Sequence, residues 1–240
     1  MIHCVKNIEI LIINLKITYN GSDHNLNLKM KSYPTILKYN LDHLGQHIFA
    51  FDKLDGSNFR TEWNRKLSKK SRFTFGFKKY GTRNRVIINV DNPFIKMVNI
   101  FKEKYAEKFD EIFRKHKLFR DSNILTLYGE FYGENSFGGM HEWEEKHNLY
   151  FYDIFLYKKD FVSPSNFYSE FNNLNMPKLV YKGEFTEQFI SDVEENKFGI
   201  KEGIVYKGVE NGKIFIGKIK TNEWLSKIKK LYGEAKMLEY

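Results

Sequence analysis

Charged residues stand inside several apolar, strand-like segments of this 240-residue chain. An ionised group is costly to bury unless it is paired, so these charges need a shared explanation. A polar cleft that binds a charged ligand supplies one, although any single member of the set could instead lie on the solvated face of a strand. The residues concerned are Lys53, Glu130, Asp153, Glu202, Lys207, Lys218 and Lys220.

The same residues belong to short motifs that follow one another along the chain. A lysine stands two residues before an Asp-Gly turn, and an arginine, acidic residues and further lysines follow. A lone Lys-x-Asp-Gly turn says little, but six motifs in this order indicate one site. They are KLDG (53–56), GTR (81–83), LYGEFYG (127–133), LYFYDIFL (149–156), EGIVYK (202–207) and KIK (218–220).

In content and order these motifs resemble those of the covalent nucleotidyltransferase superfamily of polynucleotide ligases and capping enzymes. The chain is most similar to ATP-dependent RNA ligases of the branch resembling RNA ligase 2, because Asn58 follows the lysine by five residues and "KSYPTI" (31–36) resembles the start of that domain. The likeness covers about 31–221. It implies an α+β fold: a ligase-type, ATP-grasp-like adenylyltransferase domain of mostly antiparallel sheets flanked by helices.

The resemblance implies that the amine of Lys53 attacks the α-phosphorus of ATP, releases pyrophosphate and becomes a lysine-adenylate. Asp55 and Gly56 would shape the turn that presents it. An ordinary lysine is protonated at pH 7, so the site must lower the pKa of this amine. Lys218 and Lys220 are suitable neighbouring cations, and they would also stabilise charge on the α-phosphate, which makes them catalytic candidates beside Lys53.

The remaining nucleotide contacts are also implied by the resemblance. Asn58 and Arg83 would contact phosphate or ribose, unless Arg85 takes the place of Arg83. Glu130 would bind the ribose hydroxyls, and Tyr152 would stack on adenine. The expected nucleotide-binding set is Asp52, Lys53, Asp55, Gly56, Asn58, Arg83, Glu130, Tyr152, Glu202, Lys218 and Lys220.

A divalent metal ion is expected with the nucleotide. Glu202 would lie nearest to it, with Glu130 and Asp153 as neighbours. Mg²⁺ is the expected ion, with Mn²⁺ as the alternative, since Mg²⁺ pairs with phosphates and needs few protein ligands. Lys207 is a further candidate to contact nucleotide or RNA.

RNA is the implied partner. AMP would pass to an RNA 5′-phosphate, and a 3′-hydroxyl would then attack the activated end of a nicked or single strand. The formal charge of +9 and pI near 9.3 favour a polyanionic partner. The basic, aromatic segment 65–85 is the expected contact surface, although a solvated hairpin would have the same composition.

Two other interpretations stay open. A small DNA ligase or a capping-type guanylyltransferase would share the motifs, although Asn58 and the form of LYGEFYG argue against both. A non-catalytic RNA-binding module could keep the fold. It would have no evident need for the intact set of Lys53, Glu130, Glu202, Lys218 and Lys220.

We expect a single domain. No linker rich in Ser, Gly or Pro divides the chain, so residues 30–240 should form the nucleotidyltransferase domain, preceded by an extension (1–29) outside the resemblance. Only 20 residues follow Lys220, so we expect no C-terminal OB fold or other accessory domain. Completing strand joining would then call for a partner protein or another acceptor mode.

The single cysteine, Cys4, excludes an intrachain disulfide and cysteine-based zinc sites. The apolar run 8–17 is shorter than the roughly 20 residues of a membrane span and is interrupted by Glu9 and Lys16. We therefore expect a cytoplasmic protein without a membrane partner.

Most of the motifs fall on predicted strands. A strand at 47–51 runs into the Asp-Gly turn, and the Asn-Gly pair at 211–212 predicts a hairpin. Many strands with separate helices favour an antiparallel α+β fold. Strands are predicted at 47–51, 72–77, 85–90, 124–133, 148–157, 177–185, 201–209 and 213–221.

Two helices are predicted. The first begins at Asn92-Pro93 and runs to about Leu118, because aromatic and aliphatic residues recur at three- and four-residue spacing and form one apolar stripe. The second begins near Asn222, with Trp224 and Ile228 on its apolar face. Both stripes should pack against the core.

Overall fold

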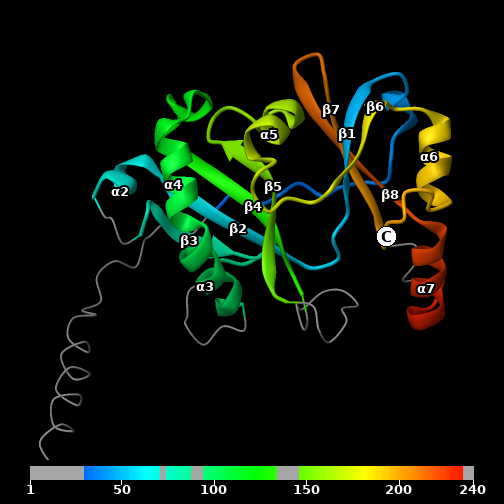
Figure 1. Ribbon diagram of the computed structural model, residues 1–240, viewed down its shortest axis with the longest axis horizontal. Coiled ribbons are helices and arrows are strands. Elements are labelled where there is room, and N and C mark those ends of the chain that lie inside the picture. Colours follow the sequence, from blue (N-terminus) through cyan, green and yellow to red (C-terminus); the bar gives the residue numbers. More distant parts are fainter. Residues whose placement is uncertain (1–29, 71–73, 88–93, 134–145, 235–240) are drawn as a thin grey trace, which may run out of the picture.

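The computed structural model describes residues 30–70, 74–87, 94–133 and 146–234. Two four-stranded antiparallel sheets stand side by side in it (Figure 1). The β1 sheet has the order β6 (Leu179–Glu184), β1 (His47–Asp52), β7 (Gly203–Glu210), β8 (Lys213–Lys220). The β2 sheet has the order β3 (Phe77–Gly81), β2 (Ser57–Asn64), β4 (Ile124–Tyr132), β5 (Asn148–Leu156). The predicted antiparallel α+β class is confirmed.

Six predicted strands are present as β1 and β4 to β8. The predicted hairpin joins β7 and β8, with Asn211 and Gly212 at φ angles of 49° and 75°. Both values lie in the left-handed region that a two-residue hairpin turn of this kind requires, and an Asn-Gly pair reaches that region at low cost.

Strand β2 is absent from the sequence prediction, and residues 53–56 do not close a hairpin. They carry the chain from the β1 sheet to the β2 sheet, where β2 lies between β3 and β4. Two of its polar residues are buried and donate hydrogen bonds: Arg60 donates to the carbonyl of Met30 at 2.9 Å, and Thr61 donates to the carbonyl of Lys79 at 2.9 Å. Because buried positions of this strand hold polar residues whose partners are distant in sequence, the strand shows no apolar pattern in the sequence.

The predicted helix from 92 to 118 is two helices, α3 (Ile95–Lys104) and α4 (Ala106–Lys115), so the single-helix prediction is wrong. The break is at Tyr105, whose φ is −128°. Its hydroxyl donates to Asn148 at 2.6 Å and accepts from Asn175 at 2.7 Å, both far away in sequence. The Asn92-Pro93 start lies outside the described residues.

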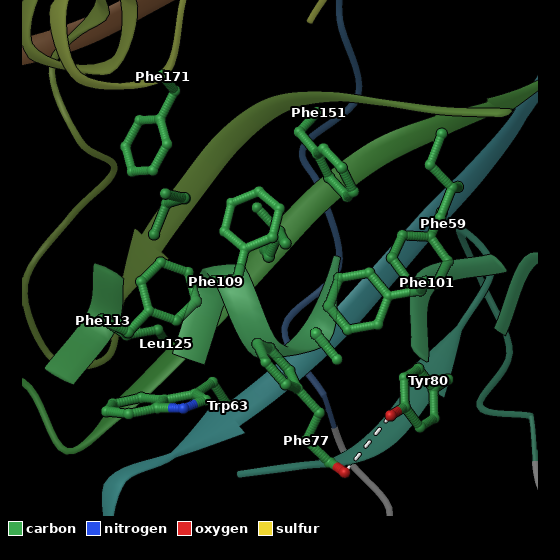
Figure 2. Packing of buried hydrophobic residues seen from close by; sticks show 14 of the residues in the cluster. Phe59, Trp63, Phe77, Tyr80, Phe101, Phe109, Phe113, Leu125, Phe151 and Phe171 are labelled. Atoms are coloured by element: carbon green, nitrogen blue, oxygen red, sulfur yellow. Dashed lines mark hydrogen bonds between the residues drawn. The ribbon is translucent and has the colours of Figure 1, made fainter. Parts of the chain in front are cut away.

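The apolar stripe of α3 and α4 does form core, as predicted. Phe101, Phe109 and Phe113 are buried against Trp63 of β2 and Phe151 of β5 (Figure 2). Aromatic rings meet mostly edge to face there, for example Phe109 and Phe151 with centroids 4.7 Å apart. This core fixes the back of the β2 sheet and leaves its other side toward the β1 sheet.

Of the strand predicted at 72–77, Phe77 begins β3, while 74–76 form a turn and 72–73 lie outside the described residues. Residues 65–70 form helix α2 (Arg65–Lys70), which begins where Asn64 Oδ1 accepts from the amides of Lys66 and Leu67. A turn at Phe75 and Gly76, both with positive φ, precedes β3. From the strand predicted at 85–90, Val86 makes an isolated bridge to Gly81, and 88–90 lie outside the described residues.

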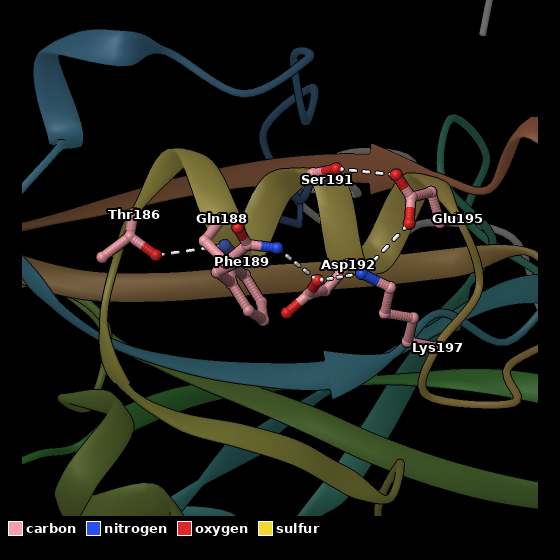
Figure 3. Close-up of polar contacts among 7 residues, drawn as sticks. All are labelled: Thr186, Gln188, Phe189, Ser191, Asp192, Glu195 and Lys197. Atoms are coloured by element: carbon pink, nitrogen blue, oxygen red, sulfur yellow. Dashed lines mark hydrogen bonds and ion pairs between the residues drawn. The ribbon is translucent and has the colours of Figure 1, made fainter.

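Helices on the β1 sheet include α6 (Glu187–Glu194), which the sequence does not predict. Thr186 caps it by accepting from the amide of Phe189, while Asp192 and Glu195 pair with Lys197 on its solvent side (Figure 3). The opposite side packs Phe189, Ile190 and Val193 into the sheet core. Helix α5 (Pro164–Phe171) is likewise absent from the prediction.

The helix predicted near 222 is confirmed as α7 (Asn222–Tyr232), capped by Thr221 and packed through Trp224 and Ile228. Two short 3₁₀ turns, η1 (Leu41–His43) and η2 (Lys117–Phe119), complete the described elements. Within the described residues, no helix has the length and apolar character needed to cross a membrane.

Residues 30–40 form an N-terminal strap that bonds to both sheets. At one end the carbonyls of Met30 and Lys31 accept from Arg60 and from Tyr128 of the β2 sheet. At the other end Lys218 of β8 donates its amide to the carbonyl of Leu37 at 3.0 Å. The strap therefore passes across the gap between the sheets.

Candidate active site

A cavity of about 730 Å³ lies between the two sheets. This volume is in the range of small-molecule sites, roughly 300–1,000 Å³. Strands of both sheets and the strap line it. The cavity is therefore formed where the two sheets face one another. The sequence-predicted residues in its lining are Asp52, Lys53, Gly56, Asn58, Arg83, Arg85, Glu130, Tyr152, Lys207, Lys218 and Lys220.

Lys53 follows β1 directly and lines the cavity. Its amide donates to the carbonyl of Gly203 at 2.9 Å, which holds the backbone of Lys53 against the start of β7. Its Nζ lies 2.7 Å from Oε1 of Glu202, whose side chain is only 2% exposed while that of Lys53 is 24% exposed. The amine of Lys53 is thus paired with a more deeply buried carboxylate, and Lys53 lines the cavity.

Lys220 contacts the same Oε1 of Glu202. Burial lowers the pKa of Lys220 to about 7, with a further contribution from the charge of Lys53. The carboxylate acts in the opposite direction, because it favours the protonated amine. Lys218 has its pKa lowered by burial, by Lys53 and by Arg83. The charge of Lys53 thus contributes to the lowered pKa of both Lys218 and Lys220.

The turn between the sheets brings Gly56 close to β4. A β-carbon built on Gly56 would lie 2.4 Å from the carbonyl oxygen of Phe131, so a larger residue would push the turn away. Asp52 lines the cavity, and its pKa is raised by burial and held down by Lys178 and Lys201. Asp55 is absent from the lining, although its charge affects the pKa values of Glu130 and Lys220.

Tyr152 enters the cavity because β5 contains a bulge. Tyr128 of β4 pairs with Asp153 and Gly129 pairs with Phe151, so Tyr152 has no partner in the ladder. A bulge changes the direction of a side chain at the point where it occurs. The hydroxyl of Tyr152 accepts from Nδ2 of Asn58 on β2, whose Oδ1 is buried without a hydrogen-bond partner among the described residues.

Glu130 on β4 lies opposite Asn58 and lines the same cavity. Burial raises its pKa to about 7, while Lys53 and the amide of Gly56 act in the opposite direction. This carboxylate can therefore be neutral or ionised near physiological pH. In either state it can bond to hydroxyl groups of a ligand.

Asp153 points into a buried network below the cavity. Its Oδ2 accepts from the hydroxyl of Tyr33 at 2.6 Å and from Nζ of Lys207 at 2.7 Å. Lys207 also donates to the carbonyl of Tyr152 at 2.7 Å. Burial raises the pKa of Asp153, and Lys207 and Tyr33 oppose that change.

A family model for RNA ligases matches residues 46–220, which span all the motifs from KLDG to KIK. The chain belongs to the RNA ligase family. This confirms the predicted membership of the nucleotidyltransferase superfamily and its RNA ligase branch.

Solved structures of Naegleria gruberi RNA ligase share the fold of this RNA ligase family member. The structure with pyrophosphate has a TM-score of 0.56 at 20% identity, covering 88% of this chain and 64% of that chain. A mutant with AMP and Mn has a TM-score of 0.57 at 19% identity, covering 82% and 58%. A mutant with ATP and Mn has a TM-score of 0.58 at 20% identity, covering 82% and 58%.

The chain therefore spans less than two thirds of the length of these ligases. No curated protein matches it. The likeness shows that the fold is shared over most of the chain.

The three carboxylates predicted to surround a metal ion do not come together. No group of three His, Cys, Asp or Glu side chains that could hold a metal occurs among the described residues. Asp153 is the member that departs, because its charge is matched by Lys207. Glu202 retains a buried Oε2 that accepts no hydrogen bond from the described residues. Since Mg²⁺ needs only one or two carboxylates besides phosphate oxygens, Glu202 fits such an ion in an RNA ligase and Asp153 does not.

The basic segment 65–85 stays a predicted RNA contact surface. Among its described residues, Thr82 to Arg85 line the cavity, and both Arg83 and Arg85 are exposed there. At its start Arg65 donates to the carbonyls of Phe113 and Phe119 and so serves the fold.

The strap supplies the site residues that sequence reasoning missed. Tyr33, Pro34, Thr35 and Ile36 line the cavity. They belong to "KSYPTI", which resembles the start of the RNA ligase domain. Nothing in the charges of this segment indicates that its residues bind a ligand. Their position follows from the bonds at both ends of the strap, which join residues far apart in sequence.

Proposed function

We propose that this protein is an ATP-dependent RNA ligase that forms a covalent intermediate with AMP on Lys53. The observation that carries the proposal is the placement of Lys53 on the cavity wall, paired with a buried Glu202 that also contacts Lys220. A lysine that only solubilised the surface would have no need of this arrangement.

In the first step, Nζ of Lys53 attacks the α-phosphorus of ATP. A nitrogen–phosphorus bond forms, the bond from the α-phosphorus to the bridging oxygen breaks, and pyrophosphate leaves. The amine must lose its proton before or during attack, and Glu202 is the nearest carboxylate to it, at 2.7 Å. Repulsion from Lys218 and Lys220 favours the loss of that proton, while the negative charge of Glu202 opposes it.

The other cavity residues suit the parts of ATP. Tyr152 offers an aromatic ring for adenine, and Glu130 offers a carboxylate for the ribose hydroxyls. Lys218, Lys220 and Arg83 form the positive side of the cavity, where the phosphates would lie. Phosphoryl transfer depends mainly on such positioning and charge neutralisation.

Glu202, with Glu130 as a neighbour, would hold a Mg²⁺ or Mn²⁺ ion together with phosphate oxygens. Such an ion would neutralise charge on the phosphate groups. The free Oε2 of Glu202 supports this assignment.

Two further transfers complete the proposed reaction. An oxygen of an RNA 5′-phosphate attacks the phosphorus of the lysine-adenylate, and the amine of Lys53 leaves. A 3′-hydroxyl oxygen then attacks the 5′-phosphorus of the activated strand, loses its proton and displaces AMP. A partner protein that supplies RNA contacts is part of the proposal.

The first experiment incubates the full chain with Mg²⁺ and α-labelled ATP or GTP, followed by denaturation. We expect label from ATP to stay on wild type and to be lost in Lys53→Ala. Lys79→Ala is a matched control, because Lys79 pairs with Glu62 at 2.8 Å outside the cavity, and it should keep the label. A folded wild type that gains no label contradicts the proposal, and label that survives Lys53→Ala contradicts the choice of nucleophile.

A second experiment addresses the acceptor. Pre-labelled protein is mixed with nicked RNA duplex, nicked DNA duplex or single-stranded RNA carrying a 5′-phosphate. We expect AMP to move to RNA ends and strands to be joined. Exclusive transfer to DNA, or stable transfer of guanylate, would favour another branch of the superfamily.

A further inference from the structure

Three buried polar side chains meet at the edge of the cavity, which Tyr33 and Lys207 help to line. Asp153, Lys207 and Tyr33 are 2%, 4% and 7% exposed. They come from β5 of the β2 sheet, from β7 of the β1 sheet and from the strap. The network therefore joins the three parts of the chain that form the cavity.

The network holds Tyr152 at several points. Lys207 donates to its carbonyl at 2.7 Å, and the ring of Tyr33 packs edge-on against its ring with centroids 5.0 Å apart. Asn58 donates to its hydroxyl. Because Tyr152 is the unpaired residue of the bulge, the β ladder does not fix it, and these contacts are what determine the direction of its ring.

Stability alone is a weak reason for such a network. Buried ion pairs are often no more stabilising than apolar residues of similar size, because each charge loses its hydration. Position is the better reason here, since Lys207 and Asp153 fix the distance between β7 and β5, and those strands carry opposite walls of the cavity.

We propose that Asp153, Lys207 and Tyr33 act as positioning residues that hold the bulged Tyr152 and the two cavity walls in the geometry that binds the adenine nucleotide. This inference rests on the proposed function, and it replaces the metal-binding role that the sequence suggests for Asp153. The network does not touch the reacting phosphate in this proposal. It acts through the aromatic ring that faces the base.

The test measures Lys53 adenylation by the full chain at varied ATP concentration, together with ATP affinity by calorimetry and thermal unfolding. Tyr33→Phe removes one hydrogen bond to a carboxylate and keeps the ring. We expect KM and Kd for ATP to rise about tenfold with a smaller change in kcat, which is the signature of lost ground-state positioning. Tyr80→Phe is the matched control, because Tyr80 is also 7% exposed but lies outside the cavity, and its KM should not change.

A second set of variants separates the effect of the network on KM from its effect on thermal stability. Asp153→Asn leaves Lys207 buried without its counter-charge, whereas Asp153→Asn with Lys207→Met removes both charges. We expect the double variant to regain thermal stability and to keep the raised KM. Asp110→Asn is the control for a buried carboxylate, since Asp110 accepts from Trp63 at 2.8 Å and pairs with Arg114 at 3.0 Å away from the cavity. It should lose stability with KM unchanged.

The outcomes are distinct. An unchanged KM in folded Tyr33→Phe, or a double variant that regains both stability and KM, overturns the positioning role. A wild type that takes no label overturns the proposed function, and the calorimetric Kd of the same variants still tests the inference. A wild type that binds no adenine nucleotide overturns both.

Discussion

The side-chain amine of Lys53 lies 2.7 Å from Oε1 of Glu202, and that carboxylate lies deeper in the protein than the amine it pairs with. Lys220 contacts the same oxygen from β8. One buried carboxylate thus contacts two lysines, and both of them line the cavity. This arrangement makes Glu202 the residue on which the charge balance of the site depends.

Glu202→Gln keeps the shape of the side chain and removes its charge. We expect adenylation of Lys53 to fall about 100-fold, because Lys53 would lose the carboxylate that positions its amine and can accept its proton. Unfolding free energy should fall by roughly 3 kcal/mol, the size found when one partner of a buried pair is removed. Single-turnover labelling and urea unfolding measure the two effects.

Glu62→Gln is the control for that variant. Glu62 also pairs with a lysine, Lys79, at 2.8 Å, but on the β2 sheet outside the cavity. Adenylation that falls equally in both variants would mean that Glu202 has no special role.

Glu130 should make stability depend on pH. Its folded pKa of about 7 lies above the ordinary value of 4.5, so the folded state holds a proton that the unfolded state has released between these values. Stability should therefore fall as pH rises from 4.5 to 7. Glu130→Gln has no such proton, so it should gain on wild type over this range, by at most about 3 kcal/mol.

Urea unfolding of both proteins at several pH values between 5 and 8 checks this. Glu111→Gln is the comparison, because hydrogen bonding to Lys115 lowers the pKa of Glu111, so its difference from wild type should not vary between pH 5 and 8. A difference between Glu130→Gln and wild type that does not vary with pH would contradict the prediction.

The sequence locates Lys53, Glu202, Lys218 and Lys220 well because these residues lie in or next to strands with a clear apolar pattern. Strands β1, β7 and β8 show clear apolar runs, and an Asn-Gly turn fixes the register between β7 and β8. Once that register is set, Gly203 lies opposite Lys220, and the charges at these strand ends must meet.

The roles of Tyr152 and Asp153 could not be predicted in the same way. They are neighbours in sequence, and simple alternation would place them on opposite faces of β5. The bulge changes this, and it depends on pairing with β4 and on the strap, neither of which is visible in the local pattern. Strand β2 was hidden for a similar reason, because its buried Arg60 finds its partner in the strap.

Gly203 is the position where the backbone leaves least room. Its φ is +152°, and an added β-carbon would lie 2.1 Å from the carbonyl oxygen of Ile219. Gly203→Ala should force β7 away from β8, lower the unfolding free energy by roughly 3 kcal/mol and disturb the bond from the amide of Lys53.

Gly212→Ala separates crowding from backbone strain. Gly212 also has a positive φ, +75°, but nothing lies within 4 Å of an added β-carbon. We expect a loss of about 1 kcal/mol from strain alone and unchanged adenylation. Equal losses in the two variants, measured by urea unfolding, would show that crowding at β8 is unimportant.

Arg83 and Arg85 differ in whether their charges affect the pKa values of other residues at the site. Both line the cavity, but the charge of Arg83 contributes to the lowered pKa of Lys218 and opposes the raised pKa of Glu130. Arg83→Ala should therefore weaken ATP binding about tenfold, the loss expected for a charge-assisted phosphate contact, while Arg85→Ala should have a smaller effect.

Calorimetric titration with ATP and then with AMP measures this, and the difference between the variants should shrink with AMP because AMP carries fewer phosphates. A larger loss in Arg85→Ala than in Arg83→Ala would assign the phosphate contact to Arg85.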